Sequence, residues 1–134
     1  MKYLLDTNIC IYLIRQKSPT IVQHLTALSI GEVGLPTIVV AELQYGVEKS
    51  NDPPRNRQAL EQFLTPFVIV DFDQAAATTY GMIRADLARR GLLIGLLDML
   101  IAAQAISRNL ILVTNNRREL STLAQLQIED WVSL

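Results

Sequence analysis

The chain has 134 residues, 50% of them hydrophobic, and its net charge of −1 argues against a strongly basic, nonspecific nucleic-acid binder. The length predicts a single domain, residues 1–134, with a normal hydrophobic core. No apolar run reaches the ~18 residues of a membrane span, and no signal peptide is recognisable, so we expect no membrane association and a cytoplasmic location. The single cysteine, Cys10, predicts a buried thiol and excludes an intrachain disulfide. The single histidine, His24, is expected at the surface, which argues against a histidine-based metal site.

Strand-like and helix-like segments alternate along the chain, which predicts an α/β fold with a mainly parallel central sheet flanked by helices. Strands are expected at 2–5, 32–35, 67–70, 110–113 and 128–132. Helices are expected at 7–15, 19–28, 37–49, around Leu60 and Phe63, and at 74–89, 98–107 and 117–120. Functional sites in such sheets gather at the carboxyl ends of the strands. Asp6 and the segment 115–119 are expected at those ends.

Four carboxylates stand where a core would carry apolar or neutral residues. Asp6 ends a strand-like run, Glu42 interrupts an apolar helix, and Asp98 opens another helix that is almost wholly apolar. Glu119 follows the fourth strand-like run. Burying one unpaired carboxylate is costly, and burying several together costs far more. A hard cation between the oxygens removes that cost, so the pattern predicts a site for Mg²⁺, with Mn²⁺ as a substitute.

Each carboxylate also has a simpler interpretation. Asp6 and Asp98 both stand where an N-cap residue would, and Glu119 fits a solvated charge in a surface turn. Glu42 is harder to explain in this way, because Ile38, Tyr45 and Gly46 share its helix face. Basic residues that could form a rim around an acidic centre occur in three clusters: Arg55 and Arg57; Arg84, Arg89 and Arg90; Arg117 and Arg118.

Several motifs in one order resemble the PIN-domain ribonucleases of the VapC-like toxin group. The matching segments are Leu5-Asp6-Thr7-Asn8, then Val40 through Gly46, Tyr80-Gly81 with Arg84 and Gly91, Ile94-Gly95 with Asp98, Ile101-Ala102-Ala103, Val113 through Asn116 with Glu119, and Glu129-Asp130-Trp131. Each motif is weak alone, but the ordered set spans nearly the whole chain. The resemblance implies a PIN-like α/β/α sandwich.

The resemblance also implies a function. By this resemblance, the chain would be the toxin of a type II toxin–antitoxin system. Such a toxin is a Mg²⁺-dependent endoribonuclease that inhibits translation until a VapB-like antitoxin masks its site. The substrate would be a tRNA, with the initiator tRNA anticodon loop as one possibility. The high share of hydrophobic residues separately favours a homodimer, assembled further with antitoxin. Within the chain, the resemblance makes Asp6, Glu42, Asp98 and Glu119 the catalytic and metal-binding acids, supported by Thr7, Asn8, Thr114, Asn116, Arg84 and Arg117. Whether Glu119 or Asn116 supplies the fourth group stays open.

Two other functions compete with this hypothesis. One is a PIN-like module that holds RNA or an antitoxin without cutting, against which the complete set of acids argues. The other is a metal-dependent phosphatase for small substrates, which would need a second acid at Asn8. A Walker loop, a GxGxxG fingerprint and an HExxH motif are all missing from the sequence.

Overall fold

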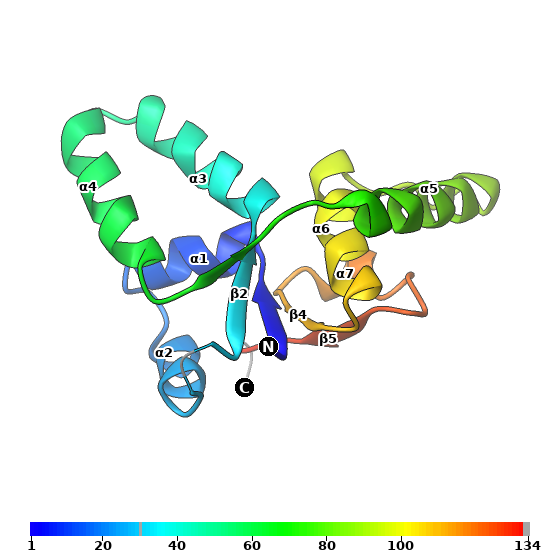
Figure 1. Cartoon of the computed structure of the whole chain (residues 1–134), viewed down its shortest axis with the longest axis horizontal. Coiled ribbons are helices and arrows are strands. Elements are labelled where there is room, and N and C mark those ends of the chain that lie inside the picture. Colours follow the sequence, from blue (N-terminus) through cyan, green and yellow to red (C-terminus); the bar gives the residue numbers. More distant parts are fainter. Residues whose placement is uncertain (30, 133–134) are drawn as a thin grey trace.

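The computed structural model describes residues 1–29 and 31–132, and its centre is a five-stranded parallel sheet (Figure 1). The strands are β1 (Tyr3–Leu5), β2 (Val33–Pro36), β3 (Val68–Val70), β4 (Ile111–Val113) and β5 (Gln127–Glu129). Their spatial order is β3-β2-β1-β4-β5, and every neighbouring pair is parallel. The expected α/β architecture is confirmed, and the described sheet contains no antiparallel strand.

The central strands are apolar because both of their faces are covered. Leu4, Leu5, Leu112 and Val113 are fully buried, as expected for parallel strands between two layers of helices. Edge strand β3 is different, since two successive residues, Val68 and Ile69, are exposed. The core therefore lies around β1 and β4, directly beneath the carboxyl ends that precede the site.

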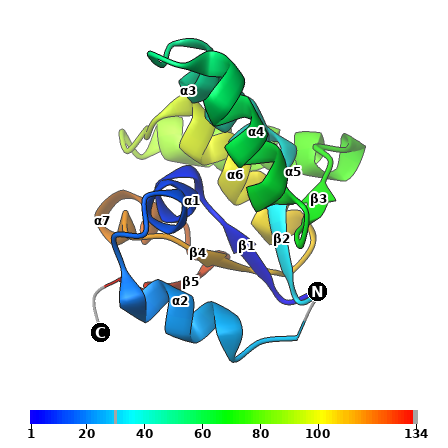
Figure 2. The ribbon, with the colours of Figure 1, turned by 90° about the vertical axis from the view of Figure 1, so that its left-hand side faces the viewer.

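Helices cover both sides of this sheet, and Figure 2 shows strands β1 and β4 between α2 on one side and α4 and α6 on the other. The helices are α1 (Thr7–Ile14), α2 (Pro19–Thr26), α3 (Thr37–Glu48), α4 (Pro53–Leu64), α5 (Gln74–Arg89), α6 (Leu96–Ser107) and α7 (Arg117–Leu120). Helices α3 and α4 pack together as one arm, and α5 packs on α6 as another (Figure 1). None of the helices in the described ranges is long and apolar enough to cross a membrane.

Capping residues explain most of the helix boundaries. The side chains of Ser18, Asp52 and Asp73 accept hydrogen bonds from backbone amides in the first turns of α2, α4 and α5. Helix α6 differs from expectation, because it begins at Leu96 after Gly95 rather than at Asp98. Leucine is a strong helix former, so Leu96 and Leu97 extend the helix by one half-turn. Asp98 thus lies inside the first turn and is not an N-cap.

Two further expectations need correction. Strand β5 ends at Glu129, because Asp130 turns the chain by accepting a hydrogen bond from the Val132 amide. His24 is half-buried rather than a free surface side chain, since its ring stacks on Trp131 with centroids 5.0 Å apart and planes inclined by 8°. Cys10 is fully buried, as expected.

The chain reverses its direction of travel across the sheet at β1. Strands β2 and β3 follow one another on one side of β1, whereas β4 and β5 lie on the other side. In open α/β sheets, the helices leave opposite sides at such a switch point and open a crevice at the carboxyl ends of the strands. Asp6 follows β1 and Thr114 follows β4, so both residues stand at this crevice.

Candidate functional site

Asp6 has two roles in the structure, and the sequence presented them as alternatives. Its Oδ1 accepts a hydrogen bond from the Ile9 amide at 3.0 Å and caps α1. Asp6 also lines a groove together with Glu42 and Asp98. The carboxylate is only 6% exposed. The cap uses one carboxylate oxygen, and the Thr114 side chain also hydrogen-bonds this carboxyl group at the edge of the groove.

Glu42 and Asp98 reach the same groove from two other helices. Glu42 comes from the middle of α3, and its Oε1 accepts a hydrogen bond of 2.7 Å from the Thr7 hydroxyl at the start of α1. Asp98 comes from the first turn of α6. Both carboxylates are partly buried. Three helices that are distant in sequence therefore place their acids around one hollow.

Glu119 belongs to this cluster through an amide bridge. Asn116 Nδ2 donates to Asp98 Oδ2 and to Glu119 Oε2, each at 3.4 Å. The Asn116 backbone amide donates to Thr114 Oγ1 at 3.0 Å, which fixes the turn after β4. Glu119 itself is exposed. Asn115, expected near the site, instead donates to the Tyr12 hydroxyl.

The cluster is short of positive charge. Burial raises the pKa of Asp6 to about 6, and the nearby charges of Asp98 and Glu42 add to the rise, against hydrogen bonds from Thr114 and Ile9. Burial also raises the pKa of Asp98, followed by repulsion from Glu119 and Glu42, whereas Asn116 lowers it. Among the described residues, the ion pairs involve other acids. The site therefore presents unbalanced negative charge to the groove.

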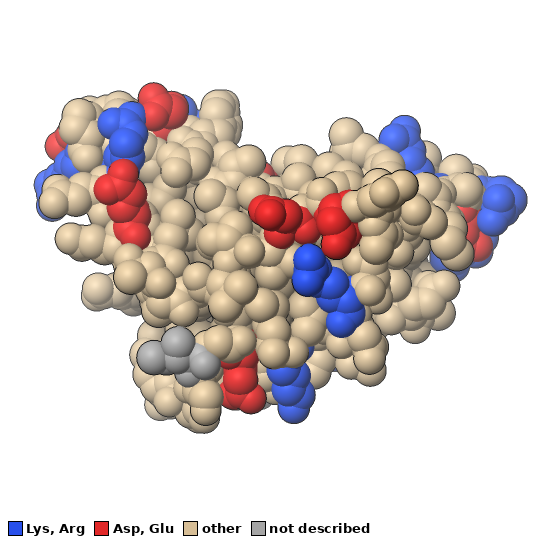
Figure 3. Space-filling view, viewed as in Figure 1, with Lys and Arg blue, Asp and Glu red and all other residues tan. Residues whose placement is uncertain are grey.

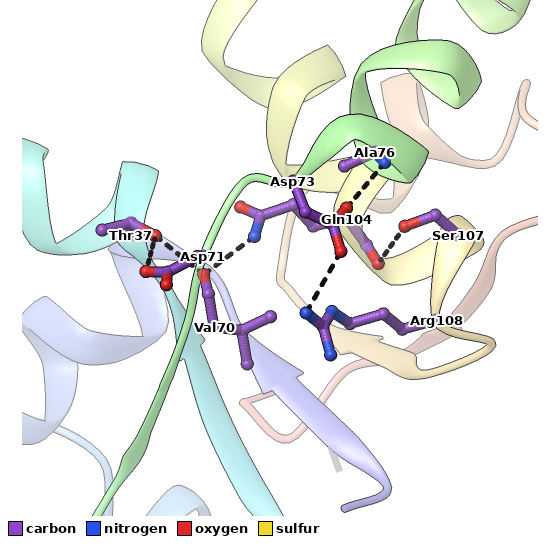
Figure 4. Close-up of polar contacts among 8 residues, drawn as sticks. All are labelled: Thr37, Val70, Asp71, Asp73, Ala76, Gln104, Ser107 and Arg108. Carbon is purple, nitrogen blue, oxygen red and sulfur yellow. Dashed lines mark hydrogen bonds and ion pairs between the residues drawn. The ribbon is translucent and has the colours of Figure 1, made fainter.

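A buried backbone carbonyl ties two of the acid-bearing helices to the sheet (Figure 4). The Val70 carbonyl at the end of β3 accepts from the Thr37 hydroxyl at 2.8 Å and from Gln104 Nε2 at 2.9 Å. Thr37 is the first residue of α3, and Gln104 lies in α6. These contacts fix α3 and α6 against the same strand end, so they limit the separation of Glu42 and Asp98.

The groove has a volume of about 830 Å³ and runs between α1, α3, α4 and the start of α6. Of the residues expected to support the acids, Thr7 and Asn8 line it. Figure 3 shows the face hollowed between the two arms. Its remaining wall is largely apolar, and its other end is lined by Arg15 and Lys49.

The basic rim differs from the one that the sequence indicated. Arg57 pairs with Glu48, Arg90 pairs with Asp86, and Arg84 donates to the Tyr80 hydroxyl at 2.8 Å. Arg84 does not line the groove, so the structure does not bring it to the acids. Arg117 and Arg118 are exposed on α7, beside Glu119.

Sequence reasoning missed the two groove cations. Arg15 is the C-cap residue of α1, and Lys49 is the C-cap residue of α3. Lys49 has no basic residue within five positions of it, and Arg15 has only Lys17 nearby, so neither belongs to the arginine clusters singled out in the sequence. The signal available in the sequence was that both residues lie at the C-terminal end of a helix. The helix before Arg15 begins with a candidate site residue, and the helix before Lys49 carries one.

The donor set suits a hard divalent cation. Within residues 1–29 and 31–132, no three His, Cys, Asp or Glu side chains close into a preformed metal cage. Mg²⁺ does not require one, because it keeps several waters and binds through one or two carboxylates together with substrate phosphates. An open, oxygen-only cluster with an excess of negative charge meets that description. Burial, with a further contribution from the neighbouring carboxylates, raises the pKa of Asp6 and of Asp98, and a bound cation would offset both effects.

Carboxylates from three elements at the switch point of a parallel sheet thus define a class of α/β protein whose site is suited to divalent-metal chemistry. The PIN domain family model matches residues 3–126. The tRNA(fMet)-specific endonuclease VapC of Shigella flexneri is 45% identical over 131 residues, covering 98% of each chain. Ribonuclease VapC2 of Haemophilus influenzae is 43% identical over 132 residues, covering 98% of this chain and 99% of that protein.

Solved structures agree with these sequence matches. The DNA-bound VapBC of Salmonella typhimurium superimposes with a TM-score of 0.93 at 40% identity, covering 98% of both chains. VapBC2 of Rickettsia felis, bound to a DNA fragment from its promoter, gives 0.92 at 40% identity, covering 98% of this chain and 99% of that one. The chain therefore belongs to the PIN-domain family, within its VapC group of ribonucleases. The resemblance noted in the sequence is confirmed.

Proposed function

We propose that this protein is the toxin of a type II toxin–antitoxin pair, a metal-dependent endoribonuclease that cuts tRNA in the cytoplasm. The observation that carries the proposal is the joint placement of Asp6, Glu42 and Asp98 around one open groove, with Glu119 tied to Asp98 through Asn116. A non-catalytic binding module has no need of this concentrated repulsion. Relatives named as ribonucleases over the full chain length support the same activity.

The acids would act together with Mg²⁺, and Mn²⁺ would substitute. Asp6 and Asp98 would hold the cation, with Glu42 and Glu119 completing the oxygen donors. When bound, the cation lowers the pKa of water and balances charge that develops on the phosphate. The chain's own contribution is orientation: Thr7 holds Glu42, Asn116 holds Asp98 and Glu119, and Thr114 hydrogen-bonds Asp6. Arg117 on α7 would contact the RNA phosphates beside this cluster.

The substrate and the partner come from the relatives. A full-length relative is named as specific for tRNA(fMet), so initiator tRNA is the first substrate to test. Structural relatives were solved as VapBC complexes, two of them with DNA, so a VapB-like antitoxin that binds and masks the toxin is the proposed partner. A basic side chain of that antitoxin would neutralise the excess negative charge of the groove.

The test is cleavage of tRNA by the purified toxin, freed of antitoxin, in Mg²⁺ or Mn²⁺. We expect discrete fragments that disappear in EDTA and in the variant Asp98→Asn, with initiator tRNA cut in preference to elongator tRNAs. Antitoxin binding should survive in Asp98→Asn, which shows that the variant is folded. Cleavage that persists in this variant would contradict the site assignment. Binding of tRNA without any cleavage would favour the binding module.

A further inference from the structure

The groove changes character along its length. The carboxylates of Asp6, Glu42 and Asp98 lie at one end, and the cations Arg15 and Lys49 line it as well. A second hollow of about 760 Å³ continues past them and adds Arg55 at the start of α4. From Glu42 to Lys49 the chain advances seven residues along α3, which is roughly 10 Å at the usual helical rise. The positive end is therefore separate from the reacting centre.

This positive end is free to bind an anion. Arg15 and Arg55 take part in none of the ion pairs formed among the described residues. The one carboxylate that lines the second hollow is Asp52, which accepts the Arg55 backbone amide at 3.3 Å as the cap of α4. Glu48, also nearby in sequence, is paired with Arg57. Three cations thus face one carboxylate in this hollow.

An aromatic side chain lies on the same wall of the groove. Tyr45 lines the groove and is 67% exposed, so the face of its ring is accessible to a ligand. It follows Glu42 by three residues on α3, and the Lys49 ammonium lies 4.9 Å from the centre of its ring. Proteins that bind single-stranded nucleic acid combine a positive groove for the backbone with aromatic side chains on which bases stack.

We propose that Arg15, Lys49 and Arg55 form a phosphate-binding subsite, and that Tyr45 stacks a base between this subsite and the acids. The proposal rests on the ribonuclease function proposed above and adds to it the path of the RNA. A single strand would run from the acids along α3 toward the ends of α1 and α3. The subsite would position the strand and set how many nucleotides on that side of the cut contribute to binding.

The structural alternative is that Arg15 and Lys49 only stabilise the C-termini of their helices, where positive charge is favourable. A measurement of RNA binding distinguishes helix stabilisation from phosphate binding. The probe is a fluorescein-labelled oligouridylate, titrated by anisotropy against toxin carrying Asp98→Asn, in EDTA and at several salt concentrations. We expect the pair Arg15→Gln and Lys49→Gln to weaken binding about tenfold. The slope of log Kd against log salt should fall by about 0.7 for each lost phosphate contact.

The matched control is Lys17→Gln, which removes an exposed cation two residues from Arg15 that does not line either hollow. It should leave affinity and slope unchanged. Tyr45→Leu should weaken binding without changing the slope, whereas Tyr45→Phe should retain affinity. An unchanged salt slope in the Arg15 and Lys49 variant, or an equal loss in Lys17→Gln, would overturn the subsite.

Cleavage by toxin with intact acids keeps this proposal distinct from the proposed function. The Arg15 and Lys49 substitutions should raise KM about tenfold with little change in kcat, because they remove binding remote from the reacting phosphate. If the unsubstituted toxin cleaves tRNA but the variant shows unchanged KM, the subsite is wrong and the ribonuclease stands. If the unsubstituted toxin cleaves no RNA, the proposed function fails, whereas the anisotropy result still decides whether this groove binds an RNA strand.

Discussion

Asp6 shows how one residue combines structural and chemical roles. An aspartate between a strand and a helix is a common cap, and this one caps α1 through the Ile9 amide. It is nevertheless nearly buried, close to Asp98 and Glu42, and its pKa rises to about 6. The cap stabilises the helix, and the excess charge destabilises the fold that holds it. The two effects are separable, because asparagine caps a helix as well as aspartate does.

Replacing Asp6 with asparagine should stabilise the protein in the absence of divalent cations. The folded state binds the Asp6 proton more tightly than the unfolded state, whose pKa is near 3.8. The cost of the charge is therefore absent below pH 3.8 and complete above about pH 6. We expect Asp6→Asn to raise the free energy of unfolding by up to about 3 kcal/mol at pH 8, but by only about 0.5 kcal/mol at pH 4. Urea denaturation in EDTA at the two pH values measures this difference.

The control for that experiment is Asp6→Ala, which removes both the charge and the cap. It should be less stable than Asp6→Asn by about 1 kcal/mol at each pH. Equal stability of the unsubstituted protein and Asp6→Asn at pH 8 would show that the carboxylate is solvated and that the repulsion inferred from its surroundings is absent.

Divalent cations should stabilise the unsubstituted toxin but not a variant that lacks one of the metal-binding acids. A ligand that binds only the folded state stabilises it in proportion to the logarithm of its concentration over Kd. Saturating Mn²⁺ should therefore raise the Tm of the unsubstituted toxin but leave Asp98→Asn almost unchanged. Differential scanning fluorimetry with and without EDTA gives both values. A similar rise in both proteins would indicate binding elsewhere.

At the level of elements, the Val70 carbonyl joins helices α3 and α6 to strand β3 through two donors, Thr37 and Gln104. Gln104 is fully buried, and its Oε1 has no hydrogen-bond partner among the described residues. An orphaned buried acceptor costs about as much as one hydrogen bond contributes. The Gln104 amide thus holds α6 in place with little net effect on stability.

Removing either donor alone should therefore change the free energy of unfolding only slightly, whereas removing both donors should lower it substantially. We expect Gln104→Leu and Thr37→Val each to change the free energy of unfolding by no more than about 1 kcal/mol. The double variant should lose an additional 1–3 kcal/mol, roughly, because it leaves the Val70 carbonyl buried without a partner. A double-mutant cycle by urea denaturation measures this coupling. Strictly additive losses would mean that water replaces both donors.

For the whole molecule, exposed apolar side chains are concentrated in the stretch from the middle of α5 to the start of α6. Of eleven large exposed hydrophobic residues in the described chain, five lie between Met82 and Leu97. Such a concentration marks an interaction surface. It supports the homodimer expected from the apolar composition. Met82 is the most exposed of the five and belongs to α5, and it does not line the groove, whereas Leu96 and Leu97 do.

A charge at Met82 should therefore weaken self-association. We expect the toxin to sediment as a dimer at micromolar concentration and Met82→Lys to shift it toward monomer, because the substitution would bury an unpaired charge at the interface. The control is Val22→Lys, at an exposed apolar position on α2. Analytical ultracentrifugation decides the point, and a monomer at all concentrations would contradict the homodimer.

The sequence by itself determined the order and type of the elements and the four acids. The hydrophobic periodicity, helix caps such as Asp73 and helix-ending residues such as Gly91 depend only on nearby residues. Such signals can therefore be recognised in the sequence alone. A capping residue is the usual local signal for a helix start and predicts that α6 begins at Asp98, whereas Gly95 begins that helix without a side-chain cap. The surface position predicted for His24 is wrong for a related reason, since its partner Trp131 lies more than a hundred residues away in sequence.

Only the tertiary structure decided which charges share a groove. Asp6, Glu42 and Asp98 meet because the sheet reverses at β1 and brings the starts of α1 and α6 and the middle of α3 to one crevice. The same packing sets Arg15 and Lys49 on the groove wall and removes Arg84 from it. Sequence records which side chains are present, but proximity between distant residues depends on how the helices cross the sheet, and no local pattern encodes that distance.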